Sequence, residues 1–502
     1  MSDEFARLKQ TLGTIHDLER VASLLAWDQE AMMPPQGAEG RADQRATLVR
    51  FAHELLVSDE LRRLLEELRS FEESQPYESD EASLIRVVRR DHEKARRVPA
   101  ELRAAFSRAG SLGLGAWLEA RARRDFRVLL PHLEEQLELK RRYVECFEPA
   151  DDPYDVLLDD FEPGLTTAEA ESVLEALKEE LVPLVAAVPE LDPREDLARS
   201  GPFDLDAQRR FSLGLLRELG FEPDAWRLDR AEHPFAMAAS LGDIRITTHF
   251  HEGHLGGLFA CLHEFGHGLY ERQVSPALER TPLATGASSA LHESQSRMWE
   301  NLVGRSRAFW VHAYPVLQGT FPERLGRGGL EAFYRSINRI QPSLIRVDAD
   351  EVTYNLHIIV RFELEREVLA GRLGLADLPA AFDERVQAYL GLDVPDVRDG
   401  VLQDMHWADL TFGYFPTYSL GNVISVQIWE RARADLADLD RAMERGEFGD
   451  LRDWLREHLP RHGRKFTPRE TLERAAGGQI DPAPYVRYLK DKLETTFGVA
   501  VA

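Results

Sequence analysis

The segment His263-Glu264-Phe265-Gly266-His267 has the residue types and the spacing of a metal site with a base beside it. Side chains four residues apart project from the same side of a helix, so both imidazoles can share one ion. Glu264 follows the first histidine and is therefore expected to act on water rather than to ligate. Two neutral imidazoles and one carboxylate suit zinc, with a fourth position left to solvent. The alternative is a pair of helix histidines that face solvent. A third ligand elsewhere in the sequence would favour the metal site over this alternative.

A glutamate on a later helix is the candidate for that third ligand. In one known arrangement the third ligand is a histidine six residues after the second, but Gln273 occupies that position. Glu293 follows a loop over 274–288 that is marked by prolines and a glycine. Two antiparallel helices joined by this loop would bring Glu293 to His263 and His267. The sequence thus predicts a ligand set of His263, His267 and Glu293.

Two further features lie close to these residues. Glu300, on the same predicted helix face as Glu293, would either support a ligand through a hydrogen bond or form a surface ion pair. A dense histidine cluster precedes the motif, at His249, His251 and His254. In its H-E-x-H pattern, which includes Glu252, the second histidine comes three residues after the first instead of four, and no apolar stripe lies behind it. We interpret that cluster as an exposed loop.

The elements that must position these residues are mainly helical. Helical periodicity runs through most of the chain, with N-terminal helices over roughly 1–145 that are interrupted at 33–37 and near 98–99. The run 244–248 is β-branched and alternating, which predicts a short strand. This strand belongs either to a small sheet beside the site, where an extended peptide could pair with it, or to an ordinary structural hairpin.

Composition limits the possible partners and locations. The chain has 502 residues, 43% of them hydrophobic, enough for a large core. A formal net charge of −25 argues against nucleic acid or an anionic membrane as the main partner. The two cysteines, Cys146 and Cys261, exclude a disulfide framework. No apolar run is long enough to span a membrane, and the first residues do not read as a signal peptide, so we expect a cytoplasmic protein.

Several ordered motifs resemble the carboxypeptidase Taq family of zinc carboxypeptidases, which are related in architecture to other helical gluzincin peptidases. The resemblance spans nearly the whole chain. It is carried by Leu24-Leu25-Ala26-Trp27-Asp28-Gln29-Glu30, Met33-Pro34-Pro35, His233-Pro234-Phe235, Asp243-Ile244-Arg245-Ile246-Thr247, His263-Glu264-Phe265-Gly266-His267, His292-Glu293-Ser294-Gln295, Ile345-Arg346-Val347-Asp348-Ala349-Asp350, Gly400-Val401-Leu402-Gln403-Asp404-Met405-His406-Trp407 and Phe412-Gly413-Tyr414-Phe415-Pro416-Thr417-Tyr418. One departure is Ala408-Asp409-Leu410, where the family pattern has small residues. It places an extra carboxylate near the expected cleft.

The resemblance implies an activity, a cofactor and an architecture. It implies a zinc metallocarboxypeptidase that removes C-terminal residues from peptides, with one zinc ion per chain that cobalt can replace. The ligands would be His263, His267 and Glu293, and Glu264 would be the general base. We expect a single domain over 1–502, mainly α: a large two-lobed helical body with a deep central active-site groove and a small β-sheet beside the site. The resemblance also implies a homodimer.

Two residues are candidates for stabilising the oxyanion that forms during hydrolysis. His406 and Tyr418 can both donate hydrogen bonds and both lie in motif segments. Structural packing is the alternative role for each of them.

Recognition of a free C-terminal carboxylate calls for an arginine, whose planar fork grips a carboxylate with two hydrogen bonds. Arg346 is the first candidate, because the family places its motif in the active site. Arg245 is the second, although it can instead pair with Asp243 on the same face of its strand. His233 is expected to line the site.

Two other functions remain open at this stage. A helical oligopeptidase with the same metal site would cut inside peptides, and hydrolysis of a C-terminally amidated peptide would favour it. A catalytically inactive scaffold that binds peptides is the other alternative, and an activity sensitive to chelators would exclude it. The intact set of His263, Glu264, His267 and Glu293 argues against the scaffold.

Overall fold

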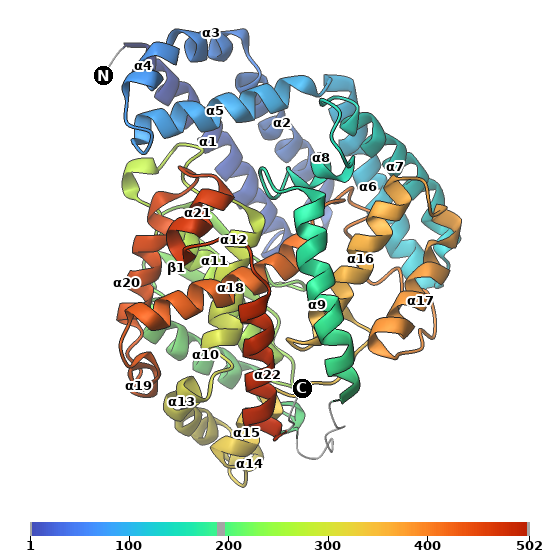
Figure 1. Cartoon of the computed structure of the whole chain (residues 1–502), viewed down its shortest axis with the longest axis vertical. Coiled ribbons are helices and arrows are strands. Elements are labelled where there is room, and N and C mark those ends of the chain that lie inside the picture. The colour runs from blue at the N-terminus through green and yellow to red at the C-terminus, as the bar shows by residue number, and fades with distance from the viewer. Residues whose placement is uncertain (1–2, 188–195, 499–502) are drawn as a thin grey trace. The chain divides into compact units, whose positions relative to one another are not determined.

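The computed structural model of the chain describes residues 3–187 and 196–498 (Figure 1). Its residues group into two compact units, each built from three separate stretches of sequence. The first unit comprises Met1–Arg96, Asp192–Ile337 and Ser425–Gln479, and the second comprises Arg97–Leu191, Asn338–Ile424 and Ile480–Ala502. No helix in the described part of the chain is both long and apolar enough to cross a membrane.

The first unit contains a three-stranded sheet among its helices. Its elements are α1 (Asp3–Ala31), α2 (Ala38–Leu56), α3 (Asp59–Glu67), α4 (Arg69–Ser74), α5 (Asp80–Arg97), α10 (Leu205–Leu219), β1 (Trp226–Arg230), β2 (Ala236–Ser240), β3 (Asp243–Thr248), α11 (Gly256–Arg272), α12 (Ser289–Arg297), the π-helix η6 (Met298–Val303), α13 (Arg307–Thr320), α14 (Pro322–Leu325), α15 (Leu330–Ile337), α19 (Leu439–Glu444), α20 (Gly449–His458) and α21 (Pro468–Ala476). Short 3-10 turns connect several of them.

The second unit is helical. Its elements are α6 (Ala100–Arg123), α7 (Leu130–Val144), α8 (Tyr154–Leu158), α9 (Thr167–Ala187), the 3-10 turn η7 (Arg346–Asp348), α16 (Thr353–Leu369), α17 (Leu378–Leu390) and α22 (Ala483–Phe497). Helix α18 (Pro416–Asp435) begins in the second unit and ends in the first. The predicted class, mainly helical with a small sheet, is confirmed. The single domain and the deep groove depend on how the two units are placed and stay predictions.

The expected breaks in the N-terminal helices are present. Helix α1 ends at Ala31 before a 3-10 turn at Pro35–Gly37, and α5 ends just before the predicted break at 98–99. The strand predicted over 244–248 is β3. It pairs in parallel with β1 and antiparallel with β2, which gives the order β1-β3-β2. The antiparallel pair β2–β3 is a hairpin within this sheet. Pairing of an extended peptide with the sheet stays a prediction.

The sheet supports helix α11 from one side. Ile244 and Ile246 on β3 are fully buried, and β3 packs against α11. The ring of Trp226 on β1 stacks on Phe265 of α11, with 5.4 Å between ring centroids. This packing fixes the height and rotation of α11, because aromatic and branched side chains leave little room for a helix to slide.

The loop between α11 and α12 is anchored in an apolar core of the N-terminal helices. Leu278 and Leu283 of the loop are buried together with Leu8 and Leu12 of α1 and with Ile85 of α5. Because these two leucines anchor the loop, the position of the first residue of α12 is fixed relative to the N-terminal helices.

In the second unit, α16 is surrounded by protein. Nearly all of its side chains are buried, and it packs against α9 and α17, as the neighbouring ribbons in Figure 1 show. Three of its buried side chains are ionisable: His357, Arg361 and Glu365. Buried groups of this kind need specific partners, and the partner of Arg361 is Asp404, which belongs to the second cluster of polar residues described below.

Candidate metal centre

Helix α11 presents both histidines of the motif to one side. The predicted apolar stripe of Leu258, Leu262, Phe265 and Leu269 is buried. The rings of His263 and His267 lie edge to face, 4.9 Å between centroids. Their side chains keep 18% and 19% exposure, enough for an ion or a small molecule to reach the ring edges.

Gly266 allows α12 to approach α11 closely. A Cβ atom at this position would lie 2.5 Å from the backbone oxygen of Gln295 and 2.6 Å from Cα of Ser296. Real Cβ atoms do not tolerate such distances, so any larger residue would push the two helices apart. The glycine between the two histidines is therefore part of what brings Glu293 within reach of them.

Glu293 faces the imidazole pair with one carboxylate oxygen. Its Oε2 lies 3.2 Å from Nε2 of His267 and 3.7 Å from Nε2 of His263. Its Oε1 accepts a hydrogen bond from Nε of Arg297, at 2.7 Å. Zinc bonds of about 2.0–2.2 Å in a tetrahedron put neighbouring ligand atoms roughly 3.3–3.5 Å apart. The two measured separations lie within a few tenths of an ångström of this range, so small side-chain movements would let the three groups hold one ion.

This set stands alone in the described part of the chain. Among residues 3–187 and 196–498, His263, His267 and Glu293 are the group of histidine, cysteine and acidic side chains whose ligand atoms lie close enough for one metal, all within 4.8 Å of each other. Two imidazole nitrogens and one carboxylate oxygen form a donor set that suits zinc and related divalent metals. The residues fit the metal that the sequence predicted.

Each imidazole also has a partner on the nitrogen that points away from the ligand set. Nδ1 of His263 lies 2.9 Å from Oε2 of Glu300, which is the supporting contact that the sequence left open. Nδ1 of His267 lies 2.6 Å from Nδ1 of His292. No role is predicted for His292 from the sequence. Its place directly before Glu293, inside a quoted motif, was the available signal.

Charges around the ligands alter their protonation. Burial would raise the pKa of Glu293, but Arg297 and the two imidazoles hold it well below its usual range. Burial likewise opposes ionisation of Glu300, yet the hydrogen bond from His263 and the charge of Arg297 lower its pKa to about 2. Both carboxylates are therefore anions at neutral pH. They favour a cation between the helices.

The two imidazoles differ in their electrostatic surroundings. Burial lowers the pKa of His263, but the charges of Glu293 and Glu300 outweigh it and the pKa is raised. Burial lowers the pKa of His267 to about 4, against the opposing hydrogen bond to Glu293. His267 is thus neutral at neutral pH and ready to ligate, whereas the carboxylates around His263 favour its protonated form.

Glu264 is buried beside the ligands without being one of them. Its side chain follows His263 on α11, and the residue is 6% exposed. Burial, with the negative charges of Glu293 and Glu300, raises its pKa to about 7, while His263 acts in the opposite direction. A carboxylate with a pKa near neutrality can both accept and return a proton. This is the property required of a general base that later acts as an acid.

A second polar cluster lies in the second unit and contains three predicted site residues: Arg346, His406 and Tyr418. Arg346 donates to Oδ1 of Asp404 from Nε and Nη2, at 2.9 and 2.8 Å. Nε2 of His406 lies 3.3 Å from the hydroxyl of Tyr418, and the guanidinium of Arg346 lies 5.1 Å from the centre of the Tyr418 ring. Residues from three separate motifs therefore meet.

Two arginines share one carboxylate in this cluster. Arg361 of α16 donates to the other oxygen of Asp404, at 2.6 Å. Burial opposes ionisation of Asp404, but the charges of Arg346 and Arg361 hold its pKa far below the usual range. Burial lowers the pKa of His406 to about 4, so its imidazole adds no charge at neutral pH. Two guanidinium groups thus face one anion.

The remaining two predicted residues lie near the sheet of the first unit. Arg245 on β3 forms a two-point ion pair with Asp243, both contacts at 2.8 Å, as the alternative in the sequence analysis anticipated. Its guanidinium also stacks on Trp27 of α1, 4.3 Å from the ring centroid. His233 is exposed in the segment before β2.

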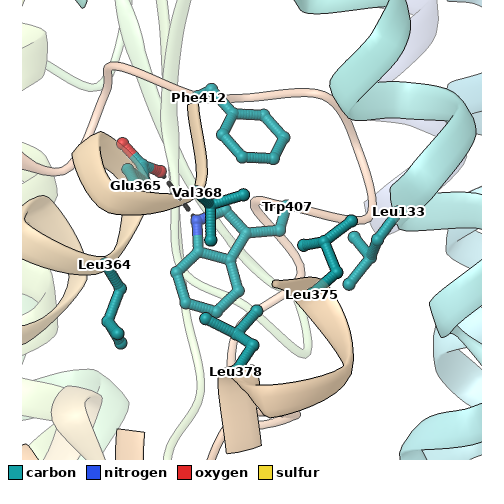
Figure 2. A pocket seen from close by; sticks show the side chains of 8 residues that line it. All are labelled: Leu133, Leu364, Glu365, Val368, Leu375, Leu378, Trp407 and Phe412. Atoms are coloured by element: carbon teal, nitrogen blue, oxygen red, sulfur yellow. Dashed lines mark hydrogen bonds between the residues drawn. The ribbon is translucent and has the colours of Figure 1, made fainter. Parts of the chain in front are cut away.

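Two further features of the structure, a histidine-rich loop and a small pocket, lie apart from the candidate metal centre. His251 and His254 stack on each other in a short bridge outside the helices, so the interpretation of that cluster as a loop is confirmed. The pocket in Figure 2 lies in the second unit and is small, with a cavity volume of about 10 Å³. It is lined by Leu133, Leu364, Glu365, Val368, Leu375, Leu378, Trp407 and Phe412, and none of the predicted site residues is among them.

The protein is mainly helical, and the two histidines of its His-Glu-x-x-His motif lie beside a glutamate from the next helix. These are features of a metallopeptidase. The family described as carboxypeptidase Taq (M32) metallopeptidase matches residues 7–493. The chain is 40% identical over 492 residues to thermostable carboxypeptidase 1 of Thermus thermophilus, with 96% of each chain covered. It is 35% identical over 488 residues to carboxypeptidase 1 of Bacillus subtilis, covering 97% of this chain and 96% of that one.

A solved structure gives the same result. The M32 carboxypeptidase from Deinococcus radiodurans R1 has a TM-score of 0.95 and 39% identity, covering 99% of this chain and 100% of that one. The chain belongs to the carboxypeptidase Taq (M32) family of metallopeptidases, which confirms the resemblance drawn from its motifs. It is a metallocarboxypeptidase, a hydrolase that acts on peptides.

Proposed function

We propose that this metallocarboxypeptidase uses zinc, held by His263, His267 and Glu293, with Glu264 as its general base. The observation that carries the proposal is the pair of distances from Oε2 of Glu293 to the two Nε2 atoms, 3.2 and 3.7 Å. Nitrogen and oxygen donors at this spacing suit zinc, and cobalt shares the same preferences.

When bound, zinc lowers the pKa of water toward neutrality and polarises a carbonyl group. Glu264 takes a proton from the attacking water and later returns it to the leaving amine, for which its pKa near 7 is suited. Glu300 and Arg297 hold the ligands in place through hydrogen bonds. The chain itself therefore supplies orientation and proton transfer.

Arg346 is our proposal for the group that binds the free C-terminal carboxylate of the substrate. With Arg361, it faces a single anion, Asp404, so the cluster has one positive charge in excess. An anionic ligand would neutralise that excess. Arg346 also has a planar fork suited to a carboxylate. We propose His406 and Tyr418 as donors to the oxyanion, supported by their contact with each other.

For Arg245 and His233 we propose supporting roles. His233 is exposed and lies outside the helices and strands, which supports a role in lining the substrate site. Arg245 remains the second candidate for binding the carboxylate, although its pairing with Asp243 and stacking on Trp27 support a structural role. We also propose a homodimer from the family resemblance, and a cytoplasmic location from the sequence features described above.

Mass spectrometry of peptide ladders tests the function. A peptide is incubated with metal-free protein alone, with added zinc, with added cobalt and with chelator. We expect stepwise loss of C-terminal residues with either metal and none with chelator. A matched peptide with an amidated C-terminus should stay intact. Internal cleavage of that amidated peptide would favour the oligopeptidase alternative, and ladders that persist in chelator would contradict the proposal.

A further inference from the structure

We propose that His292 and Glu271 are positioning residues that hold the ligand His267 in the orientation and the tautomer needed for metal binding. The inference rests on the proposed zinc site. It concerns two residues that the mechanism above leaves unused, and it predicts a measurable effect on metal affinity.

The three side chains form one continuous hydrogen-bonded chain. Nδ1 of His267 lies 2.6 Å from Nδ1 of His292. Nε2 of His292 then lies 3.0 Å from Oε1 of Glu271. Glu271 comes from the last turns of α11 and His292 from α12, so the chain links the two helices that bear the ligands. We call it the His267–His292–Glu271 chain.

Metal binding permits one arrangement of protons along this chain. Nε2 of His267 must present a lone pair to the metal, so its Nδ1 carries the proton and donates. Nδ1 of His292 must then accept, which leaves the proton of that ring on Nε2. The carboxylate of Glu271 can only accept when ionised, and it receives that proton's hydrogen bond. Every donor faces an acceptor. The opposite tautomer of His292 would place two N–H groups against each other at 2.6 Å.

Glu271 is fixed at the far end of the chain. Thr285 donates to its Oε1 at 2.7 Å and Arg20 of α1 donates to its Oε2 at 3.3 Å. Arg20 also donates to the backbone oxygens of Ala238 and Ala284, at 2.8 and 2.9 Å. Burial opposes ionisation, but the hydrogen bond from His292 and the charge of Arg20 bring the pKa of Glu271 to about 2. The acceptor at the end is therefore an anion.

The ring of His292 is also held by packing against its neighbours. It packs beside the ring of Tyr270, with 5.0 Å between centroids. Gly286 lies against both rings, since a Cβ atom there would lie 3.0 Å from the His292 ring and 2.8 Å from Tyr270. The absence of a side chain at Gly286 leaves the space that the imidazole occupies. Shape and hydrogen bonds thus select the same ring position.

The two ligand imidazoles are consequently supported in different ways. His263 donates directly to a carboxylate, that of Glu300. His267 reaches its carboxylate through the imidazole of His292. Such outer hydrogen bonds fix the orientation of a ligand and raise its basicity, and their loss costs about 10- to 100-fold in metal affinity.

Zinc affinity of the metal-free protein, measured by competition with a fluorescent chelator at fixed pH, tests the inference. We expect His292→Leu to raise the dissociation constant of zinc about 10- to 100-fold. His292→Asn should lose less, because its amide oxygen replaces Nδ1 as the acceptor for His267. Glu271→Gln keeps the shape but removes the negative charge, so it should also weaken zinc binding. A change in the visible spectrum of the cobalt-loaded His292 variants should accompany the loss.

The matched control is His312→Leu, which breaks a histidine–glutamate contact of 2.7 Å elsewhere in the first unit. It should leave the zinc dissociation constant within twofold of wild type. Equal affinities for wild type, His292→Leu and Glu271→Gln would overturn the inference, as would equal losses for His292→Leu and His292→Asn. If His292→Leu does not fold, His292→Asn and Glu271→Gln decide in the same way. A wild-type chain that binds no zinc would instead overturn the proposed function.

Discussion

Oε2 of Glu293 lies 3.2 Å from Nε2 of His267, while the other oxygen of that carboxylate is held at 2.7 Å by Arg297. The arginine leaves a single oxygen directed at the imidazole pair. It also keeps the carboxylate ionised, because a cation beside a buried acid lowers its pKa. The ligand is therefore oriented and charged before a metal arrives, and less ordering remains for the binding step.

Replacement of Glu264 by glutamine tests the general base. Glutamine has nearly the same shape but cannot accept the proton from water. We expect Glu264→Gln to keep stoichiometric zinc and to lose about 10²- to 10⁴-fold in kcat. Metal analysis of the purified variant and kcat on a short peptide are the measurements. Turnover near the wild-type rate with zinc present would remove Glu264 from that role.

Arg346→Ala tests recognition of the free carboxylate. The remaining cation, Arg361, still neutralises Asp404, so the excess positive charge disappears with Arg346. We expect binding of peptides with a free C-terminus to weaken by at least tenfold, and binding of the matched amidated peptides to change little. Dissociation constants of both peptides, measured on the Glu264→Gln background to prevent cleavage, give the answer.

The matched control for this prediction is Tyr354→Phe. Tyr354 contacts Nη1 of Arg346 through its hydroxyl at 2.9 Å, and phenylalanine removes that contact but no charge. Its effect should be much smaller than that of Arg346→Ala. Equal weakening of free and amidated peptides by Arg346→Ala would place Arg346 outside the carboxylate site.

Gly266→Ala tests the close approach of α11 and α12. The added methyl group would meet the backbone of Gln295, so the helices must separate. We expect a loss of about 1–3 kcal/mol in the free energy of unfolding and weaker zinc binding. Gly214→Ala in α10 is the control, because nothing lies within 4 Å of its added Cβ. That variant should gain about 0.5–1 kcal/mol in the free energy of unfolding. Similar behaviour of both variants would contradict the prediction.

The buried His357 makes stability depend on pH. Burial, with the charges of Arg361 and Arg346, lowers the pKa of His357 from 6.5 to about 3. Below pH 6.5 the unfolded chain takes up a proton that the folded chain refuses, so stability falls as the pH drops toward 3. One such group costs roughly 1 kcal/mol between pH 7 and 5.5.

His357→Gln should remove that part of the pH dependence. Its amide can still donate to the backbone oxygen of Ser343, which lies 3.0 Å from Nε2 of the histidine. Denaturant unfolding of wild type and variant at pH 7 and pH 5.5 measures the difference. We expect wild type to lose about 1 kcal/mol more than the variant over this interval. An identical loss in both proteins would show that His357 does not titrate as described.

Much of the candidate site could be predicted because it depends on local regularity. The separation of His263 and His267 places them on one face of any α-helix. The buried stripe from Leu258 to Leu269 identifies the opposite face. Glu293 could be predicted because the loop over 274–288 lets a second helix return antiparallel to the first. Its distance from the histidines could not be predicted, because it depends on how closely the helices pack at Gly266.

Partners that come from distant segments were harder to predict. The contact of Arg346 with Asp404 joins two motifs that lie more than fifty residues apart, and no sequence pattern predicts that Arg361 shares Asp404. The π-helix at Met298–Val303, which bears Glu300, also escaped prediction, because its sequence shows an ordinary helical pattern. Side-chain pairing between elements depends on packing, which periodicity does not report.

The sequence by itself determined the class of protein, and it predicted the ligand set and the base, since these depend on residue types at spacings that the geometry of a helix imposes. The tertiary structure alone decided which nitrogen of each imidazole is free for the metal. That choice depends on what touches the other nitrogen: Glu300 for His263 and His292 for His267. Hydrogen bonds act over about 3 Å, so such contacts exist only after distant parts of the chain have packed together.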